Sequence, residues 1–263
     1  MLIGFVGLLD VLGFSALISG GDEGARLKRY LECINTVLGD SADSAVDYVV
    51  FSDNIVLTTR DDAEASFQAL LARCSTLFGL LLGQEIALRG AIAHGSFFRE
   101  SSAGGVFVAG RAVVDAYTFE TKQDWVGIML APSALRRMPD LAERCAIASP
   151  STEDGLKAIR ERLAWAAFVQ TCFAIPFHSS TPFENSDFNG FAIVPTHGVT
   201  EFAPLRDSLG ASLKAVEWLK SLAPDPPAQA KYQRAHRWLF PIYQKWHDVA
   251  YWSERFNETK WPA

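Results

Sequence analysis

Two apolar stretches near the start of the chain each deliver an aspartate to the end of a predicted strand. Residues 2–18 (LIGFVGLLDVLGFSALI) carry one charged side chain, Asp10. An ionised Asp is costly to bury without a partner, so eight apolar-rich residues ending in Asp predict a buried strand that presents a carboxylate at its end. Residues 46–59 (VDYVVFSDNIVLTT) predict two strands joined by a tight turn at 52–54, with Asp53 in the turn.

In the rest of the first half, segments with the apolar spacing of a helix alternate with segments that have the apolar spacing of a strand. Apolar spacing predicts helices over 22–39, 61–82 and 111–122, and strands over 85–95, 106–109 and 125–130. The order is therefore strand, helix, hairpin, helix, strand, helix, strand. This order predicts an α+β fold, a ferredoxin-like mixed sheet with helices on one face.

From Pro150 the composition changes, and a mostly helical C-terminal extension is expected. The pattern predicts helix over 161–170 and 205–222, a loop over 178–190, a strand-like piece over 191–195 and a proline-rich break at 224–227. The last segment mixes aromatic and basic residues, which can stack on nucleotides but more often pack or form interfaces. We therefore divide the chain into a first domain, 1–149, and a structural extension, 150–263.

Charge and cysteine content narrow the class of protein. The 263 residues carry a formal net charge of -6, which argues against a general nucleic-acid binder. Four widely separated cysteines form no C-x-x-C pattern, so the sequence signals neither a zinc site nor a disulfide framework. The apolar N-terminus lacks a basic leader and carries Asp10 centrally, so a signal peptide and a membrane span are both rejected. A cytoplasmic location is expected.

The best candidate chemistry is the pair of strand-end aspartates. Asp10 is followed by Gly13, Phe14 and Ser15; glycine permits a close backbone approach to a ligand, and Ser15 can cap a short helix. Free amide groups there would suit a phosphate. Asp10 and Asp53 supply the hard oxygen ligands that a two-metal nucleotidyl site needs. Taken alone, each aspartate fits a solvated turn better than a metal site; the presence of both favours the metal site.

Four motifs in this order resemble the catalytic domain of class III nucleotidyl cyclases. LLDVLGFS resembles the family's F-x-D-h-x-G-F-[ST] strand, in which h is apolar, and Asp53 matches a second metal aspartate in a strand-turn-strand hairpin. RGAIAHG, from Arg89, resembles R-x-G-I-H-x-G with Ala91 and Ala93 replacing Gly and His. GRAVVDAYT, from Gly110, resembles the family helix G-x-x-V-N-x-A-x-R.

The resemblance implies a site, cofactors and an assembly. Two divalent ions, Mn²⁺ or Mg²⁺, would be held by Asp10, Val11 and Asp53, and a nucleoside triphosphate would be the substrate. The triphosphate would lie against the amides after Gly13. In the family each site is completed across a two-fold axis, so a homodimer is expected.

Departures from the family pattern bear on the base and on the transition state. The purine-reading positions fall on Val49 and Phe107, which cannot hydrogen-bond a purine edge, and Tyr48 would border the same wall unless strand alternation turns it away. The family's transition-state Asn and Arg fall on Val114 and Thr118. Arg111 and Arg89 are then the candidates for stabilising phosphate, with Arg111 expected to be catalytic.

The combination is most similar to the Pycsar pyrimidine cyclases of bacterial antiphage defence. That branch implies conversion of UTP or CTP to the 3′,5′-cyclic monophosphate and pyrophosphate, with a separate effector protein reading the product. The alternative is a catalytically inactive cyclase-like module that binds a nucleotide or a partner. A polymerase-like palm is a poorer third reading, because no basic duplex channel is visible.

Overall fold

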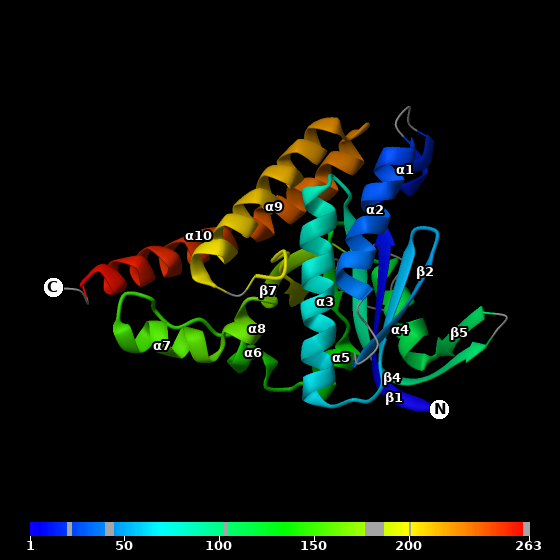
Figure 1. The fold of residues 1–263 in the computed structure, drawn as a ribbon, viewed down its shortest axis with the longest axis horizontal. Helices are drawn as coiled ribbons and strands as arrows, with labels where there is room; N and C mark the ends of the chain where they lie inside the picture. Colours follow the sequence, from blue (N-terminus) through cyan, green and yellow to red (C-terminus); the bar gives the residue numbers. More distant parts are fainter. Residues whose placement is uncertain (20–22, 40–44, 103–104, 177–186, 200, 260–263) are drawn as a thin grey trace.

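A mixed eight-stranded sheet forms the centre of the molecule (Figure 1). The computed structural model describes residues 1–19, 23–39, 45–102, 105–176, 187–199 and 201–259. Seven strands lie in the order β2-β3-β1-β4-β6-β8-β7, and β5 pairs with β4 outside this path. The β4–β6 pair is parallel and the other pairs are antiparallel. The strands are β1 (Leu2–Val11), β2 (Val46–Phe51), β3 (Asn54–Thr59), β4 (Leu88–Ser102), β5 (Gly105–Gly110), β6 (Gly127–Leu130), β7 (Val169–Pro176) and β8 (Asp187–Ile193).

Ten helices accompany this sheet in the described part of the chain. They are α1 (Phe14–Ser19), α2 (Glu23–Leu38), α3 (Glu64–Gly83), α4 (Arg111–Glu120), α5 (Pro132–Arg137), α6 (Leu141–Arg144), α7 (Glu153–Glu161), α8 (Leu163–Ala166), α9 (Phe202–Leu222) and α10 (Pro226–Thr259). The α+β class, the mixed sheet and the C-terminal helices are as predicted.

Helices lie on both faces of the sheet, so the expectation of a single covered face is wrong. Phe5 of β1 stacks on Phe67 of α3 with ring centroids 4.4 Å apart. The next residue, Val6, clusters instead with Phe97 and with Ala112 of α4. Because successive side chains of a strand point to opposite faces, α3 and α4 cover opposite faces of β1.

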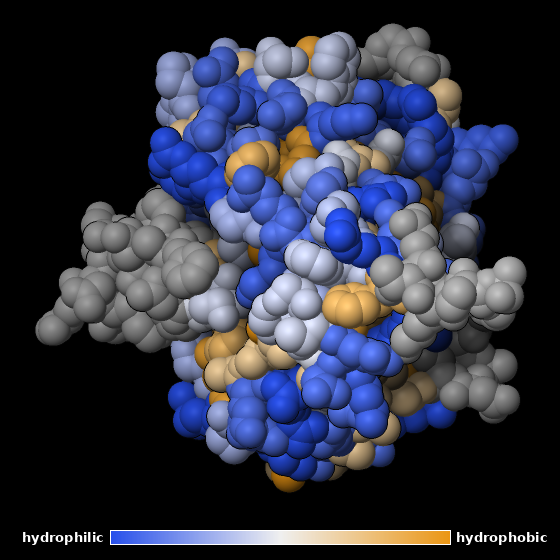
Figure 2. Space-filling model, turned by 90° about the vertical axis from the view of Figure 1, so that its left-hand side faces the viewer, coloured by the Kyte–Doolittle hydropathy of each residue, from blue (hydrophilic) through white to orange (hydrophobic). Residues whose placement is uncertain are grey.

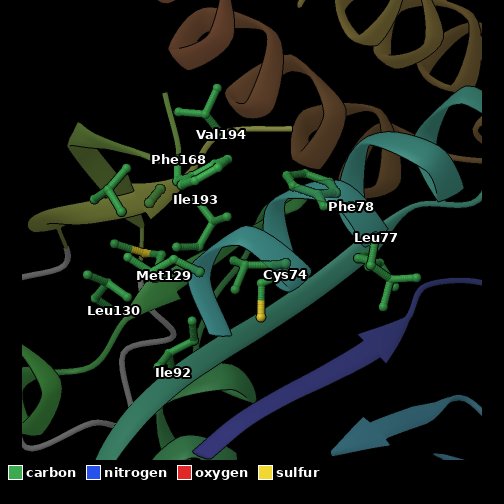
Figure 3. Packing of buried hydrophobic residues seen from close by; sticks show 14 of the residues in the cluster. Cys74, Leu77, Phe78, Ile92, Met129, Leu130, Phe168, Ile193 and Val194 are labelled. Atoms are coloured by element: carbon green, nitrogen blue, oxygen red, sulfur yellow. The ribbon is translucent and has the colours of Figure 1, made fainter. Parts of the chain in front are cut away.

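The second half of the chain extends the same sheet and the same core. β8 pairs with β6 through Met129 and Ala192, although β8 lies beyond residue 150. Figure 3 shows Cys74 of α3 and Met129 of β6 packed together with Phe168 and Ile193 in one buried cluster. The division at 149/150 stays a prediction about sequence organisation, and the packing runs across it.

Two sequence expectations in this second half hold only in part. The sequence predicts helix over all of 161–170; Leu163–Ala166 is helical, as α8, but β7 begins at Val169, because short apolar runs fit a buried strand as well as a helix. Residues 187–190 belong to β8 and not to a loop, while 178–186 lie outside the described residues. The proline-rich break is short, since Pro226 already begins α10.

The long helices α9 and α10 run side by side along the upper left of the molecule (Figure 1). The left-hand side of the molecule in Figure 1, where α10 ends, is largely hydrophilic and shows only small, separate hydrophobic groups (Figure 2). Among the described residues one helix, α3, is long and apolar enough to cross a membrane. Its inward side chains are buried against the sheet, as expected for a core helix.

Candidate active site

Asp10 lies at the end of β1, between β3 and β4. Its cross-strand neighbours are Asn54 and Arg89. Its side chain is 20% exposed. It lies on the same face of the sheet as Val6, the face that α4 covers, whereas Phe5 lies on the other face. Burial raises the pKa of Asp10 above its usual value; Arg89 lowers it, and Asp53 raises it further. The predicted strand therefore does deliver a half-buried carboxylate to its end.

Asp53 lies in the β2–β3 turn directly beside the end of β1. The amide of Val11 donates to the Asp53 carbonyl at 2.9 Å, so the turn is bonded to the residue after Asp10. Asn54 Nδ2 donates to Asp53 Oδ1 at 3.0 Å, and the turn begins at Ser52 with φ 56. The structure thus brings together the two aspartates that are 43 positions apart in sequence.

A buried ion-pair network adjoins Asp10. Arg89 Nη2 donates to Asp10 Oδ2 at 3.4 Å, Nε donates to the carboxylate of Glu120 at the end of α4, and Nη1 donates to the Gln123 carbonyl at 3.3 Å. The side chains of Arg89 and Glu120 are 17% and 3% exposed. Burial raises the pKa of Glu120; Arg89 opposes this shift, and Asp10 adds to it.

Glu120 was not singled out from the sequence. The available signal was an acid at the inner end of the helix AVVDAYTFE, with an arginine on the strand below. Helix and strand meet only through tertiary packing, so spacing along the chain gave no indication of the pair.

The glycine turn after Asp10 departs from the prediction in one detail. Gly13 has φ 73, which favours glycine, and a Cβ there would meet no atom within 4 Å. The helix α1 begins at Phe14, so Ser15 lies inside it and is not its cap. Phe14 packs on Tyr30 of α2 with ring centroids 5.9 Å apart. The turn therefore borders the aspartates, and Phe14 anchors it to the core.

The residues expected to line the base are not together within one chain. Val49 pairs across β3 with Val56, which pairs with Leu8, so Val49 shares the face of Asp10. Tyr48 pairs with Leu57 and lies on the opposite face, so strand alternation turns it away from Asp10. Phe107 pairs with Glu100, eleven residues beyond Arg89 on β4, or about 35 Å of extended strand.

Arg111 also lies far from Asp10 in the same chain. It begins α4 next to Gly95, which pairs with Gly4, six positions before Asp10. Six strand residues span about 20 Å. Arg111 instead lines a cleft of about 330 Å³, whose other polar and charged lining residues are Asp115, Thr118, Lys122, Ser133 and Arg136.

The donor set at Asp10 and Asp53 fits a divalent cation that takes its other ligands from phosphate and water. The turn that carries Asp53 is bonded to the end of β1 that carries Asp10, and Asp10 is desolvated, so a cation would relieve the repulsion between the two carboxylates. Among the described residues no group of three or more His, Cys, Asp or Glu side chains could hold a metal by itself. Val11 is buried in the strand and could contribute only its carbonyl oxygen.

Comparisons with known proteins give structural matches only. No protein-family model matches the chain, and no curated protein matches its sequence. The guanylyl cyclase domain of the RhoGC fusion protein from the aquatic fungus Blastocladiella emersonii matches with 15% identity and a TM-score of 0.43, covering 53% of this chain and 85% of that one.

Two further cyclase structures match over more of the chain. The guanylate cyclase domain of RhGC from Catenaria anguillulae, in complex with GTP, matches with 10% identity and a TM-score of 0.44, covering 72% of this chain and 94% of that one. The adenylyl cyclase CyaB from P. aeruginosa matches with 11% identity and a TM-score of 0.43, covering 72% and 92%.

Proposed function

We propose that the protein is a nucleotidyl cyclase whose site is built on Asp10 and Asp53. The observation that carries the proposal is the meeting of these two aspartates beside a glycine turn, with Asp10 half-buried and its pKa raised by burial. Such a pair suits a cation that also binds a triphosphate. When bound, divalent ions would activate the ribose 3′-hydroxyl and neutralise the triphosphate.

The residues of this chain have separate tasks in the proposed reaction. Asp10 and Asp53 would hold the cations, and the backbone from Gly13 to Ser15 would border the triphosphate. The 3′-hydroxyl of the substrate gives up its proton to solvent, its oxygen forms a bond to the α-phosphorus, and the bond from the α-phosphorus to the bridging oxygen breaks, so that pyrophosphate leaves. Arg89 is held by three internal acceptors, so its task is to orient Asp10 and not to follow the leaving group.

We further propose that the substrate is UTP or CTP. The side chain of Val49 lies on the same face of the sheet as Asp10 and cannot hydrogen-bond to a base. The side chain of Phe107 is apolar as well. A purine edge left unpaired against such a wall costs about 1 to 3 kcal/mol. A cyclic pyrimidine nucleotide acting on a separate effector in antiphage defence is the biological role that the sequence resemblance implies.

Incubation with each of the four nucleoside triphosphates and Mn²⁺, followed by mass measurement of the product, tests both levels of this proposal. We expect cyclic UMP or cyclic CMP to form well above cyclic AMP or cyclic GMP. Dominant cyclic AMP or cyclic GMP would contradict the pyrimidine assignment alone. No cyclic product from any of the four would contradict the cyclase assignment.

We propose that a second copy of the chain completes each site. Arg111 and Phe107 lie far from Asp10 in their own chain, so they could reach such a site only from another copy. Large apolar side chains are exposed near them, including Phe98, Val106, Val114 and Tyr117. Exposed apolar groups on one region favour an interface.

Mixing two inactive variants tests the shared site. We expect an Asp10→Asn chain and an Arg111→Ala chain each to lose turnover, and their mixture to regain part of it, because one site of the mixed dimer keeps both residues. Mixing two Asp10→Asn preparations is the control and should restore nothing. A chain that sediments as a monomer at assay concentration would contradict this prediction.

A specific observation also favours a second candidate, a catalytically inactive module that binds nucleotides. Asp10 is already paired with Arg89, and the family's transition-state positions carry Val114, which is 61% exposed, and Thr118. In this case nucleotide would bind without any turnover. The four-nucleotide assay, combined with a binding measurement, separates the two functions.

A further inference from the structure

The start of α10 is tied to the strand end that carries Asp10. Arg234 Nη1 donates to the backbone carbonyl of Asp124 at 2.6 Å and to its carboxylate at 2.7 Å, and Lys231 Nζ lies 3.8 Å from the same carboxylate. The preceding residue, Gln123, accepts from Arg89 and donates its side-chain amide to the Gly90 carbonyl at 2.8 Å. Hydrogen bonds therefore connect α10 to residues 123–124, and residue 123 to Arg89, which donates to Asp10.

Buried aromatic contacts fix the position of α10. Trp238 packs edge-on against Trp125 with ring centroids 5.2 Å apart, and its Nε1 donates to the Thr171 carbonyl at 3.2 Å. Lys231 precedes Trp238 by seven residues, which is two helical turns, so both lie on the side of the helix that faces the sheet. The ammonium group of Lys231 is thus held near this strand end by the packing of its helix.

Among the cations at this end, Lys231 has the weakest internal contact. Arg89 uses all three guanidinium nitrogens on protein acceptors, and Arg234 is bound to Asp124. Lys231 is 32% exposed, and its only ion pair with a described residue, at 3.8 Å, exceeds hydrogen-bond distance. Its three N–H donors can therefore turn toward a ligand.

We propose that Lys231 of α10 binds the triphosphate of the substrate at the Asp10 site of its own chain. The inference rests on the proposed function and deepens it, because it makes α10 part of the binding site and not only a structural extension. Lysine binds phosphate as a flexible point charge, and Val114 and Thr118 supply no cation for this purpose. Lys231 of α10 then supplies the positive charge that Val114 and Thr118 do not.

Calorimetric titration with inorganic triphosphate in the presence of Mn²⁺ tests the inference without requiring turnover. We expect Lys231→Gln to weaken triphosphate binding about 10-fold, the loss of one charge-assisted contact, and Lys231→Arg to keep most of the affinity. Lys245→Gln is the matched control, since it removes the same charge from an exposed position of the same helix, and it should leave binding unchanged. Lys231→Met serves as a second neutral variant, and thermal unfolding verifies the fold of each.

Two outcomes would overturn the inference: equal triphosphate binding by the wild type and both neutral Lys231 variants, or no triphosphate binding by the wild type. A third outcome would contradict the proposed cyclase activity but not the binding role of Lys231. If triphosphate binding depends on Lys231 but no nucleotide is cyclised, the binding role of α10 stands and the cyclase assignment fails.

Discussion

Replacing Asp10 or Asp53 with asparagine is expected to leave a folded protein whose turnover falls on the order of 1,000-fold. In the proposed site each change removes an anionic ligand from a dication, and several kcal/mol of transition-state stabilisation correspond to about that factor in rate. Neither change should unfold the chain, because Asp10 lies at a strand end, Asp53 lies in a turn, and Asp10 is already a desolvated charge. Cyclic product formation per folded protein, with the fold checked by thermal unfolding, is the measurement.

Asp47→Asn provides a matched control for these two variants. Asp47 lies on β2 of the same hairpin and pairs with Arg99 at 2.6 Å, so the substitution removes a comparable charge away from the proposed metal site. Its turnover should stay near that of the wild type. A folded Asp10→Asn protein with near-full activity would show that the site is wrongly assigned.

Arg89→Met is expected to lower the free energy of unfolding by roughly 3 to 5 kcal/mol. The substitution leaves the almost fully buried Glu120 without its cation, and breaking a buried pair from one side usually costs that much. Adding Glu120→Gln should recover part of the loss, because the unpaired charge is then removed as well. Denaturant unfolding at neutral pH measures both effects.

Arg99→Met tests whether the loss is specific to the Arg89 network. Arg99 is as buried as Arg89, with 17% of its side chain exposed, but its partner Asp47 is 25% exposed and has a second partner in Arg60 at 3.4 Å. The released carboxylate can therefore rehydrate, and the loss should be clearly smaller. Equal losses for Arg89→Met and Arg99→Met would contradict the structural role given to Glu120.

The first half of the fold follows closely from the sequence. Long apolar runs with clear periods predict β1, the β2–β3 hairpin and α3, and their ends shift by only a few residues in the structure. β4 runs from Leu88 to Ser102, well past the predicted end at Gly95, because β5 pairs with it there. The part of β4 beyond Gly95 is held in a strand by its pairing with β5, so its own sequence shows no alternation of apolar and polar residues that would predict it.

The candidate site is predictable only in part, because its remaining features depend on packing. Asp10 and Asp53 each follow from a strand-end acid, and the structure places them together. The Arg89–Glu120 pair and the approach of Lys231 join elements that are distant in sequence, so no local pattern indicates them. Tyr48 lies on the wrong face for the predicted wall, since a shift of one strand position reverses the side chain.

The most direct test of the central claim is a crystal structure of the protein with Mn²⁺ and a nucleoside triphosphate analogue that cannot be cyclised, measured for anomalous scattering of manganese. The account predicts a manganese peak that contacts the carboxylates of both Asp10 and Asp53 and a phosphate oxygen of the nucleotide. A structure with bound nucleotide, no manganese at these aspartates and Asp10 still paired with Arg89 would contradict it.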